Sequence, residues 1–406
     1  MKSLSIWLDK IKKNEYPELD EDKLVDVLII GGGITGASAL YHLRNANLSV
    51  MLVEQNKIGE STTGRSTGKL SFLQNDLIDK IRDSHNDSIA LKYLESQKNA
   101  IDITLGIITR ENIECDLKRL DAYLYTNKLE EVEKIKKLED FLVDSGFNIK
   151  KGNCNLVESK YMIKTEDSYV FHPVKFVSSL IKRSGLPVYE KTSVKKIEKK
   201  DGLYICNTGN YVVRAKWVIL ASHYPYFLKP FLFPMKSSIE KSYLSASIYN
   251  GKPLSLISYS YPFISMRTHN EYLIYLSNSH SLNSDVDDKK NFLELIKKND
   301  DLNLKPTNIW SNNDIITSDG LPYIGVLKEN MLIATGYNTW GLASGVLAGR
   351  ILTDIILEKN NEYIELFNPK RCNASVAIGI FSNALKSLDG YIKGYTNKRK
   401  EHPHKC

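Results

Sequence analysis

The chain has 406 residues, of which 42% are hydrophobic and 25% charged, so we expect an ordinary folded protein of two or three domains. The formal net charge is only +7, and part of that excess lies in the last residues, which argues against a nucleic-acid-binding surface. The five cysteines are scattered and form no CxxC pair, which disfavours a disulfide scaffold and a zinc knuckle.

The sequence contains no segment with the character of a membrane span or a signal peptide. The first 22 residues mix lysine, aspartate and glutamate with short apolar clusters. The most hydrophobic long segment, residues 341–357, carries Arg350 and Asp354 and repeats at helical spacing, so it is predicted to be a core helix. We therefore expect a soluble, cytoplasmic protein.

The first predicted unit is a strand, a tight turn, a helix and a second strand. Residues 25–30 form a run that is apolar except for Asp26, which is typical of a strand buried on both faces of a parallel sheet. The glycine-rich turn 31–36 follows, then a helix to about Asn45 and a second buried strand over residues 49–54. This order predicts a β-α-β unit.

Further elements follow in chain order. Helices are predicted over residues 87–106 and 129–142, the second with Leu129 facing inward, and Pro173 and Gly185 are expected to open and close a short helix. The remaining predicted elements are strands over residues 122–125 and 331–334, a meander over 193–221, a mainly antiparallel sheet over 242–276, and helices over 289–298 and 341–357.

The turn Gly31-x-Gly33-x-x-Gly36 has the context of a dinucleotide-binding site. Gly31 permits the tight turn, Gly33 lets the backbone approach a pyrophosphate, and Gly36 lets the helix pack on the strand. The helix N-terminus offers N–H groups to the phosphates. Glu54 ends the second strand, where an acid binds ribose hydroxyls. A glycine-rich turn without a ligand is the disfavoured alternative.

A polar loop of small residues over positions 59–69 follows the second strand and favours FAD over NAD. Its hydroxyls and the Arg65 guanidinium suit a long phosphate-linked ligand. A nicotinamide enzyme does not need such a loop, whereas a buried flavin needs contacts along its whole length.

Four segments together resemble the FAD-dependent oxidoreductases of the D-amino-acid oxidase and glycine/sarcosine oxidase group. They are residues 31–36, 61–69, 319–325 and 334–341, in family order and spacing, and the resemblance extends from about Trp7 to Glu365. The loop at 61–67 and Ser265-Met266-Arg267 are most similar to bacterial glutamylputrescine-oxidase-like members.

The resemblance implies an α/β plus α+β fold, in which a Rossmann-like FAD-binding domain is interleaved with a substrate domain built on a mainly antiparallel sheet. The implied boundaries are 1–75, 155–235 and 308–366 for the FAD-binding domain, 76–154 and 236–307 for the substrate domain, and 367–406 for a C-terminal helix and basic tail.

The resemblance and the glycine motif also imply a set of FAD contacts. They are Gly31, Gly33, Ile34, Thr35, Gly36, Glu54, Gln55, Ser61, Thr62, Thr63, Arg65, Ser66, Thr67, Val194, Ala221, Ser222, Asp319, Gly336, Thr339, Trp340, Gly341 and Leu342. Gly341 begins a helix whose positive end would face the pyrimidine ring of the flavin. No Cys or His lies in residues 59–69 or 336–342, so we expect non-covalent FAD.

Two residues are candidates for catalysis. Arg267 lies in an otherwise uncharged predicted strand, and its planar fork suits a substrate carboxylate; the alternatives are a surface arginine or a salt bridge. Lys69 follows the flavin loop and is a candidate to lie over the ring and promote reaction with oxygen; the alternative is a surface lysine.

The predicted activity is FAD-dependent oxidation of an amine or amino acid, with dioxygen or a protein as electron acceptor. The alternatives are a flavin protein that feeds an iron–sulfur partner, a non-catalytic FAD-binding protein and, least favoured, an NAD dehydrogenase. Residues 373–395 resemble the helix that links longer relatives to a Rieske-type domain. The paired Cys and His ligands of a cluster are missing, and a metal at His402, His404 and Cys406 is disfavoured.

Overall fold

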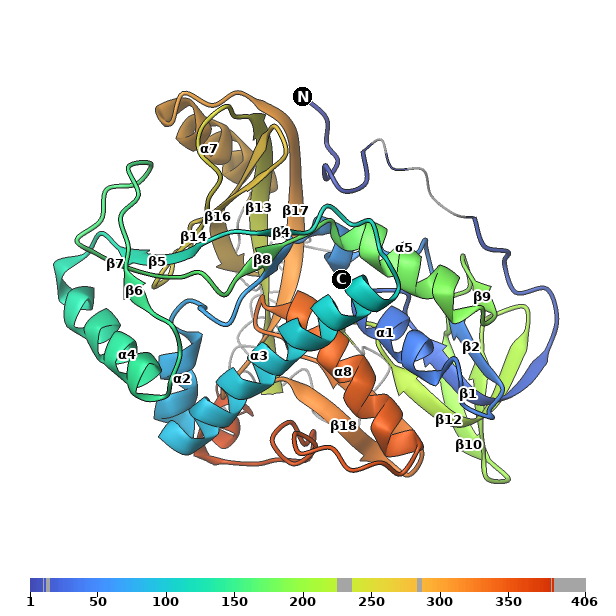
Figure 1. The fold of residues 1–406 in the computed structure, drawn as a ribbon. Helices are drawn as coiled ribbons and strands as arrows, with labels where there is room; N and C mark the ends of the chain where they lie inside the picture. Colours follow the sequence, from blue (N-terminus) through green and yellow to red (C-terminus); the bar gives the residue numbers. More distant parts are fainter. Residues whose placement is uncertain (10, 12–14, 225–235, 283–286, 381, 383–406) are drawn as a thin grey trace, which may run out of the picture.

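The computed structural model describes residues 1–9, 11, 15–224, 236–282, 287–380 and 382. Two eight-stranded sheets and one three-stranded sheet form the framework of this part of the chain. In Figure 1 the first sheet lies on the right and the long strands of the second stand in the upper centre.

The first sheet has a parallel centre. Strands β9, β2, β1, β12 and β19 follow one another across it in parallel pairs, while β10 and β11 form the antiparallel meander on β12, and β18 pairs antiparallel with β19. Its strands are β1 (Lys23–Ile30), β2 (Val50–Val53), β9 (Val188–Tyr189), β10 (Lys196–Lys200), β11 (Leu203–Asn207), β12 (Val212–Leu220), β18 (Tyr323–Lys328) and β19 (Met331–Thr335).

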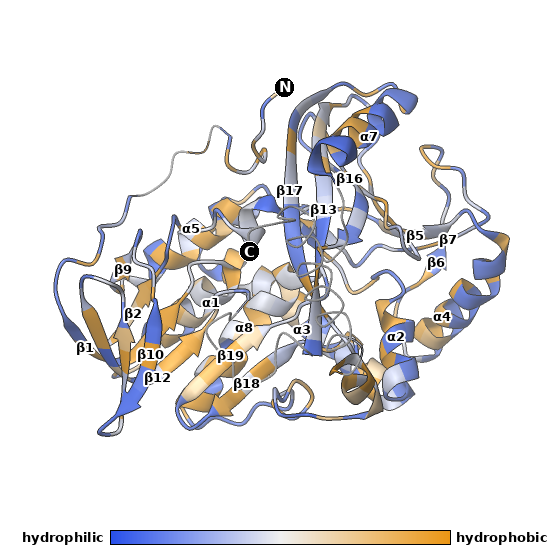
Figure 2. Ribbon diagram, turned by 180° about the vertical axis from the view of Figure 1, so that it is seen from behind, coloured by the Kyte–Doolittle hydropathy of each residue, from blue (hydrophilic) through white to orange (hydrophobic). Residues whose placement is uncertain are grey.

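The second half of strand β1, residues 27–30, is buried on both faces, as its apolar run predicts. Val27 and Ile29 belong to the core beneath helices α1 and α8, whereas Leu28 and Ile30 belong to a second core on the opposite face. Figure 2 shows the apolar colouring of the central strands between these two layers.

Helices α1 (Ile34–Leu43), α3 (Asp87–Arg110), α5 (Pro173–Ser184) and α8 (Gly341–Ile356) cover the first face. Gly349 lets α8 approach α1 closely, because a Cβ atom there would lie 2.5 Å from the Ser38 side chain. Ser38 Oγ also donates to the Val346 carbonyl at 2.8 Å. Pro173 and Gly185 do bound α5, and Gly185 adopts the left-handed conformation at its C-cap.

The second sheet is mainly antiparallel and runs in the order β17-β13-β16-β15-β14-β5-β7-β6. Its strands are β5 (Ala122–Thr126), β6 (Lys150–Lys151), β7 (Tyr161–Thr165), β13 (Ser237–Ile248), β14 (Ser255–Ser258), β15 (Ser265–His269), β16 (Tyr272–Ser281) and β17 (Pro306–Thr317). The helices η2 (Leu129–Glu131), α4 (Val132–Asp144) and α7 (Asp288–Asp301) lie against it, and α2 (Leu77–Ser84) precedes α3.

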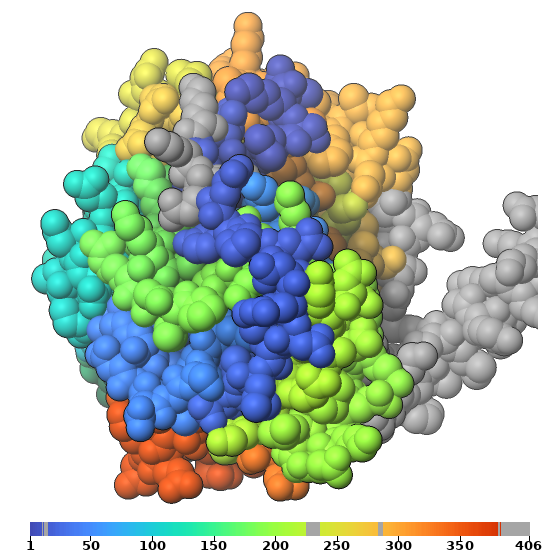
Figure 3. Space-filling view, turned by 90° about the vertical axis from the view of Figure 1, so that its right-hand side faces the viewer, coloured from blue at the N-terminus to red at the C-terminus, as the bar shows by residue number. Residues whose placement is uncertain are grey.

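The third sheet and the N-terminal segment connect the two large sheets. Strands β3 (Lys69–Leu70), β8 (Tyr169–Val170) and β4 (Lys118–Arg119) form the small sheet. At the N-terminus, the Lys2 N–H donates to Thr307 at 2.7 Å and the Leu19 N–H donates to the Thr192 hydroxyl at 3.1 Å. Figure 3 shows these first residues, in dark blue, spread across one face of the molecule.

Several sequence predictions need correction. The prediction for Leu129 is wrong, because its side chain is 74% exposed where the chain is still in the short helix η2. Helix α3 extends beyond the predicted end to Arg110. Strands β7 and β17 pair in the second sheet, although the expected boundaries assign residues 161–165 and 308–317 to the FAD-binding domain.

The predicted linking helix begins near residue 374, but most of residues 373–395, like His402, His404 and Cys406, lies outside the described residues. Within the described ranges, no helix combines the length and apolar character needed to cross a membrane. The same ranges contain no group of three or more side chains arranged to hold a metal ion.

Candidate active site

A large cavity lies between the carboxyl ends of the parallel strands and one face of the second sheet. It encloses about 1720 Å³, including space open to solvent. The predicted residues on its wall are Gly31, Gly33, Ile34, Thr35, Glu54, Gln55, Ser61, Thr62, Thr63, Arg65, Ser66, Thr67, Lys69, Val194, Ala221, Ser222, Thr339, Trp340, Gly341 and Leu342.

The glycine turn between β1 and α1 is built for close approach. Gly31 has φ = +114°, and a Cβ atom there would lie 2.5 Å from the Ala221 carbonyl oxygen, so only glycine fits. A Cβ at Gly36 would lie 1.9 Å from the Gly31 carbonyl oxygen. Gly36 therefore acts in packing α1 onto the turn and does not line the cavity.

Glu54 connects the end of β2 to this turn. Its Oε2 accepts a hydrogen bond from the Gly32 N–H at 2.7 Å, and its Oε1 accepts one from the Asn56 N–H at 2.8 Å. Burial raises the pKa of Glu54, and these two hydrogen bonds act in the opposite direction. The carboxylate thus holds the turn while lining the cavity where a ribose is expected.

The polar loop after β2 contains the short helix η1 (Thr62–Arg65) and is held from outside by two tryptophans. Trp7 Nε1 donates to the Ser66 carbonyl at 2.7 Å, and Trp310 Nε1 donates to the Arg65 carbonyl at 2.9 Å. On the inside, Thr63 Oγ1 accepts the Ile34 N–H at 3.1 Å. The loop is therefore fixed beside the first turn of α1.

The turn before α8 is fixed by a buried asparagine. Asn338 has φ = +50°, its Oδ1 accepts the Thr317 N–H at 2.8 Å, and its Nδ2 donates to the Gly320 and Gly336 carbonyls at 2.8 and 3.1 Å. The N-terminus of α8 therefore faces the cavity at Gly341.

Two further predicted contacts lie away from the cavity. Gly336 shapes the turn, since it has φ = +75° and a Cβ atom there would lie 2.5 Å from the Thr317 side chain. Asp319 is fully buried in an ion pair with Arg371 and does not line the cavity, so the structure gives no support to its predicted FAD contact.

The second sheet forms the opposite wall of the cavity with residues that the sequence analysis did not single out. They are Ser242, Leu244, Ile257, Phe263, Leu276, Ser279, Asn312, Asp314 and Ile315, together with Ser265. The rest of the wall is formed by Ile30, Val53, Asn75, Thr192, Ser193, His223, Ala334 and Tyr337. A sequence signal existed for Ile30, Val53, Ser193, His223 and Tyr337, because they adjoin predicted contacts.

Asp314 is the one carboxylate that the second sheet places on the described part of this wall. Glu240 lies directly opposite it in the β13–β17 register. Burial raises the pKa of Asp314 to about 7, and the charge of Glu240 acts in the same direction. The site therefore has a carboxyl group that titrates near neutrality.

Lys69 lies on the cavity wall and is only 7% exposed, so it is not a surface lysine. Arg267 is fully buried but does not line the cavity: its Nη2 donates to the Phe171 carbonyl at 3.2 Å, and its guanidinium lies 4.8 Å from the centroid of the Trp7 ring. This position does not support the predicted carboxylate clamp. Its alternatives are wrong, since Arg267 is not at the surface and no described carboxylate lies within salt-bridge distance.

Comparison with known proteins assigns the family. Residues 26–355 match the family model DAO, FAD dependent oxidoreductase, and the chain belongs to this family. It is 27% identical over 384 residues to a putative Rieske 2Fe-2S iron–sulfur protein of Bacillus subtilis, covering 90% of this chain and 75% of that protein. It is 23% identical to gamma-glutamylputrescine oxidoreductase of Escherichia coli, covering 84% of this chain and 85% of that protein.

The fold is that of solved family members. Glycine oxidase from Geobacillus kaustophilus superposes with a TM-score of 0.71 at 17% identity, covering 86% of this chain and 99% of that structure. The predicted fold class, a Rossmann-like part combined with a mainly antiparallel sheet, is confirmed by this likeness and by the two sheets described above.

The residues of the cavity fit FAD. Gly31 and Gly33 leave a bare backbone at the helix N-terminus, as a pyrophosphate requires. Ser222 Oγ is buried on the wall with no hydrogen-bond partner among the described residues, so a polar ligand atom would satisfy it. The protein is an FAD-dependent oxidoreductase of this family.

Proposed function

We propose that this protein oxidises a small amine or amino acid at its carbon–nitrogen bond. The observation that carries the proposal is the single cavity that joins the glycine turn, Glu54 and the N-terminus of α8 to the polar inner face of the second sheet. Relatives named as gamma-glutamylputrescine oxidoreductase and glycine oxidase support this reaction class. When bound, FAD supplies the acceptor for the two electrons and the hydrogen that leave the substrate.

The chain would hold FAD along its whole length. The glycine turn and the N-terminus of α1 would bind the pyrophosphate, Glu54 and Val194 the adenosine, and loop 61–67 the middle of the cofactor. The N-terminal N–H groups of α8, which begins at Gly341, would stabilise negative charge at the pyrimidine end of the flavin.

We further propose that the substrate binds as a cation. The second sheet brings Asp314 to the cavity wall, whereas the only arginine among the described lining residues is Arg65, on η1. Lys69 is a second basic residue on this wall, and because burial lowers its pKa to about 7, it is no permanent counter-charge for a substrate carboxylate, whose burial without a full cation would cost several kcal/mol. This arrangement favours an amine with few or no acidic groups.

The reduced cofactor must pass its electrons on, and two acceptors are candidates. Dioxygen is one. The other is an iron–sulfur protein, which is favoured by the relative named as a putative Rieske 2Fe-2S protein. Slow reoxidation of the photoreduced protein by air, together with rapid reoxidation by a one-electron acceptor, would favour the protein acceptor.

Anaerobic titration with a panel of polyamines, monoamines, N-methyl amino acids and D-amino acids tests the proposal. We expect loss of the flavin absorbance near 450 nm with at least one amine. If no member of the panel reduces the flavin although dithionite does, the protein is a non-catalytic FAD-binding protein or acts on another class of substrate.

A further inference from the structure

Lys69 occupies the part of the cavity that belongs to the second sheet. It lies on the short strand β3, directly after Gly68, and its side chain crosses to strands β14 and β15. Ser265 and Ile257, which come from those strands, line the same part of the wall. The ammonium or amine group of Lys69 is therefore held where the proposed substrate would bind.

Two hydrogen bonds fix the direction of this amine. Nζ of Lys69 donates to the Leu256 carbonyl at 2.7 Å and to the Ser265 hydroxyl at 2.6 Å. The lysine nitrogen is tetrahedral and has three sites besides its bond to carbon. Two of these sites carry the hydrogens donated to Leu256 and Ser265, so the third has no partner among these groups. In the neutral amine the two donated hydrogens occupy the first two positions, and the third holds a lone pair.

Arg267 lies behind Lys69 on β15. A Cβ atom on Gly68 would come within 2.6 Å of Arg267 Nη2, which shows how closely the guanidinium packs beneath this part of the chain. Nε and Nη1 of Arg267 have no hydrogen-bond partner among the described residues, so its charge is poorly neutralised. Trp7 covers one face of the guanidinium.

The other ionisable groups near this pair lie beyond Arg267 or elsewhere on the wall. Asp116 acts on Arg267 from a distance and is already paired with Lys175 at 2.8 Å. His172 and His269 pack edge to face against Trp7 and against each other. The ionisable residues that share the cavity wall with Lys69 are Glu54, Arg65, His223, Asp314 and Tyr337.

These surroundings act on the two cations differently. Burial, reinforced by the Arg267 charge, lowers the pKa of Lys69 to about 7. Burial also lowers the pKa values of the two histidines beside Trp7, that of His172 to about 4 and that of His269 to about 3. Burial lowers the pKa of Arg267 only to about 9, so the guanidinium stays charged at neutral pH. A neutral Lys69 beside a charged Arg267 is the favoured state above neutrality.

We propose that Lys69 is the base that accepts the ammonium proton of the incoming substrate, and that Arg267 is a positioning residue whose charge keeps Lys69 neutral. This inference rests on the proposed function. The substrate ammonium loses one proton to the Lys69 nitrogen, leaving a free amine and a lysine ammonium, and no electrons move in this step. The free amine has the lone pair that forms the carbon–nitrogen double bond when the substrate is oxidised.

The charge state of Lys69 can be measured directly in the FAD-bound protein. Lysine labelled with carbon-13 at the ε position gives an NMR signal that reports protonation, and Lys69→Met identifies the signal of this residue. We expect a midpoint near pH 7, well below that of a free lysine. A Lys69 that remains charged up to pH 9 would overturn the proposal, whatever the activity of the protein.

Two variants test the part played by Arg267. Arg267→Met removes the charge and should raise the pKa of Lys69 by about one, whereas Arg267→Lys keeps part of the charge, because the same burial lowers the pKa of a lysine there, and should raise the pKa of Lys69 by less. Bound FAD and the melting temperature show whether each variant is folded. If Lys69 titrates with the same midpoint in both folded variants, the charge of Arg267 does not influence the protonation of Lys69. If Arg267→Met does not fold, the wild-type midpoint and the kinetics below still decide the role of Lys69.

The kinetic test compares Lys69→Met and Lys69→Arg with the wild type across pH. Arginine keeps hydrogen-bond donors but offers no lone pair at neutral pH. Both variants should lose roughly 10²–10³-fold in kcat/KM for an amine at pH 7. The loss should shrink to less than tenfold near pH 10, where solvent supplies the free amine.

The outcomes separate the two proposals. A loss that is constant with pH, or an active Lys69→Arg variant, would mean that Lys69 is not the base. If the wild type oxidises no amine, the proposed function fails, while the NMR midpoint still reports whether Lys69 is neutral.

Discussion

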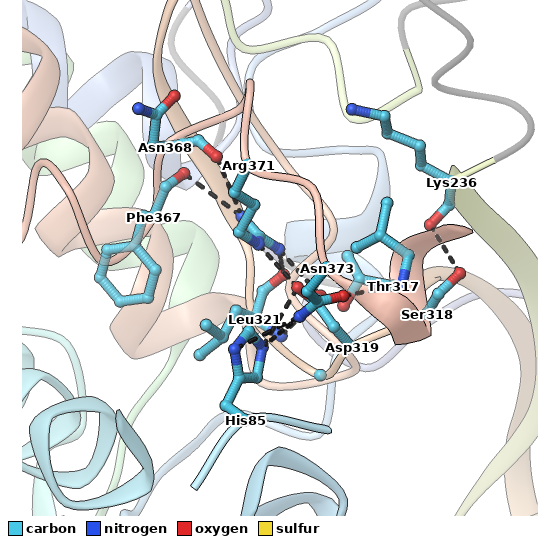
Figure 4. Close-up of polar contacts among 12 residues, drawn as sticks. His85, Lys236, Thr317, Ser318, Asp319, Leu321, Phe367, Asn368, Arg371 and Asn373 are labelled. Atoms are coloured by element: carbon cyan, nitrogen blue, oxygen red, sulfur yellow. Dashed lines mark hydrogen bonds and ion pairs between the residues drawn. The ribbon is translucent and has the colours of Figure 1, made fainter. Parts of the chain in front are cut away.

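Arg371 and Asp319 form an ion pair with two hydrogen bonds. The pair links the segment after α8 to residues 319–320, which contact the turn that precedes α8. Nε of Arg371 donates to Oδ2 of Asp319 at 2.7 Å, and Nη2 donates to Oδ1 at 2.9 Å. His85 approaches the same carboxylate at 3.3 Å, as Figure 4 shows. The carbonyl of the next residue, Gly320, accepts the Asn338 amide, so the pair acts on the turn that precedes α8.

Breaking this pair should destabilise the protein strongly. Asp319 is fully buried, so Arg371→Met would leave its carboxylate without the main counter-charge, at a cost of about 3–5 kcal/mol. Arg371→Lys keeps the charge but loses the fork, and we expect a smaller loss of about 1.5–3 kcal/mol. Urea unfolding of the FAD-bound protein measures both values. A loss below about 1 kcal/mol for Arg371→Met would contradict this account.

The same ion pair makes the stability of the folded protein depend on pH. Burial acts to raise the pKa of Asp319, but the hydrogen bonds from Arg371 and His85 outweigh it and hold the pKa below its usual value. The stabilisation is therefore present above the pKa of an unfolded aspartate, near 3.9, and is lost as the pH falls through the lower folded value. Acid unfolding should begin at a higher pH in Arg371→Met than in the wild type.

Gly33→Val should abolish FAD binding without unfolding the protein. Among the described residues, a Cβ atom at Gly33 meets only Thr63 Oγ1 within 4 Å, at 3.2 Å, so the valine would project into the cavity space expected for the pyrophosphate. We expect FAD affinity to fall at least a hundredfold, measured by quenching of FAD fluorescence on titration. The melting temperature of the apoprotein should stay nearly constant.

Two other glycines provide controls for that experiment. Gly106→Ala lies at an exposed position of α3, where a Cβ atom would meet no other described part of the chain within 4 Å, and it should leave FAD affinity unchanged. Gly36→Ala should prevent correct folding, because its Cβ would overlap the Gly31 carbonyl oxygen. If Gly33→Val binds FAD normally, the pyrophosphate has been placed wrongly.

FAD should be bound without a covalent link. The described wall of the cavity contains no cysteine and a single histidine, His223, whose Nε2 lies 3.1 Å from the Asn313 carbonyl. Acid precipitation should release all the yellow colour into the supernatant. Colour that stays in the pellet of the wild type but not of His223→Ala would contradict this expectation and identify the linkage.

Asp314 should control the binding of cationic ligands. Its pKa, raised to about 7 by burial, means that its negative charge appears as the pH rises through neutrality. The affinity for an amine that lacks a hydrogen on the carbon next to nitrogen, and so is not oxidised, should increase roughly tenfold between pH 6 and 8. Perturbation of the flavin spectrum measures this binding.

The matched variants for this prediction are Asp314→Asn and Asn313→Asp. Asp314→Asn should bind the amine weakly and without this pH dependence. Asn313→Asp adds a carboxylate at an exposed neighbouring position that does not line the cavity, and it should leave the binding curve unchanged. Equal affinity of wild type and Asp314→Asn at pH 8 would show that Asp314 does not contact the ligand.

The sequence by itself determined the features that depend on neighbouring residues. The β-α-β unit, the glycine turn with Glu54 and the helix between Pro173 and Gly185 are local patterns, because strand burial, turn conformation and helix ends are decided within a few residues. The family resemblance rests on the same local motifs, which explains why the FAD contacts near the turn lie on the cavity wall.

Only the tertiary structure decided how deeply each charged side chain lies and what it faces. Arg267 and Ser265 alternate with Met266 on β15, yet Ser265 lines the cavity and bonds to Lys69, whereas Arg267 packs against Gly68 and does not line the cavity. Asp314 reaches the cavity through the pairing of β17 with β13. Such contacts join residues some two hundred positions apart, as Lys69 and Ser265 are, and no spacing within a single segment encodes them.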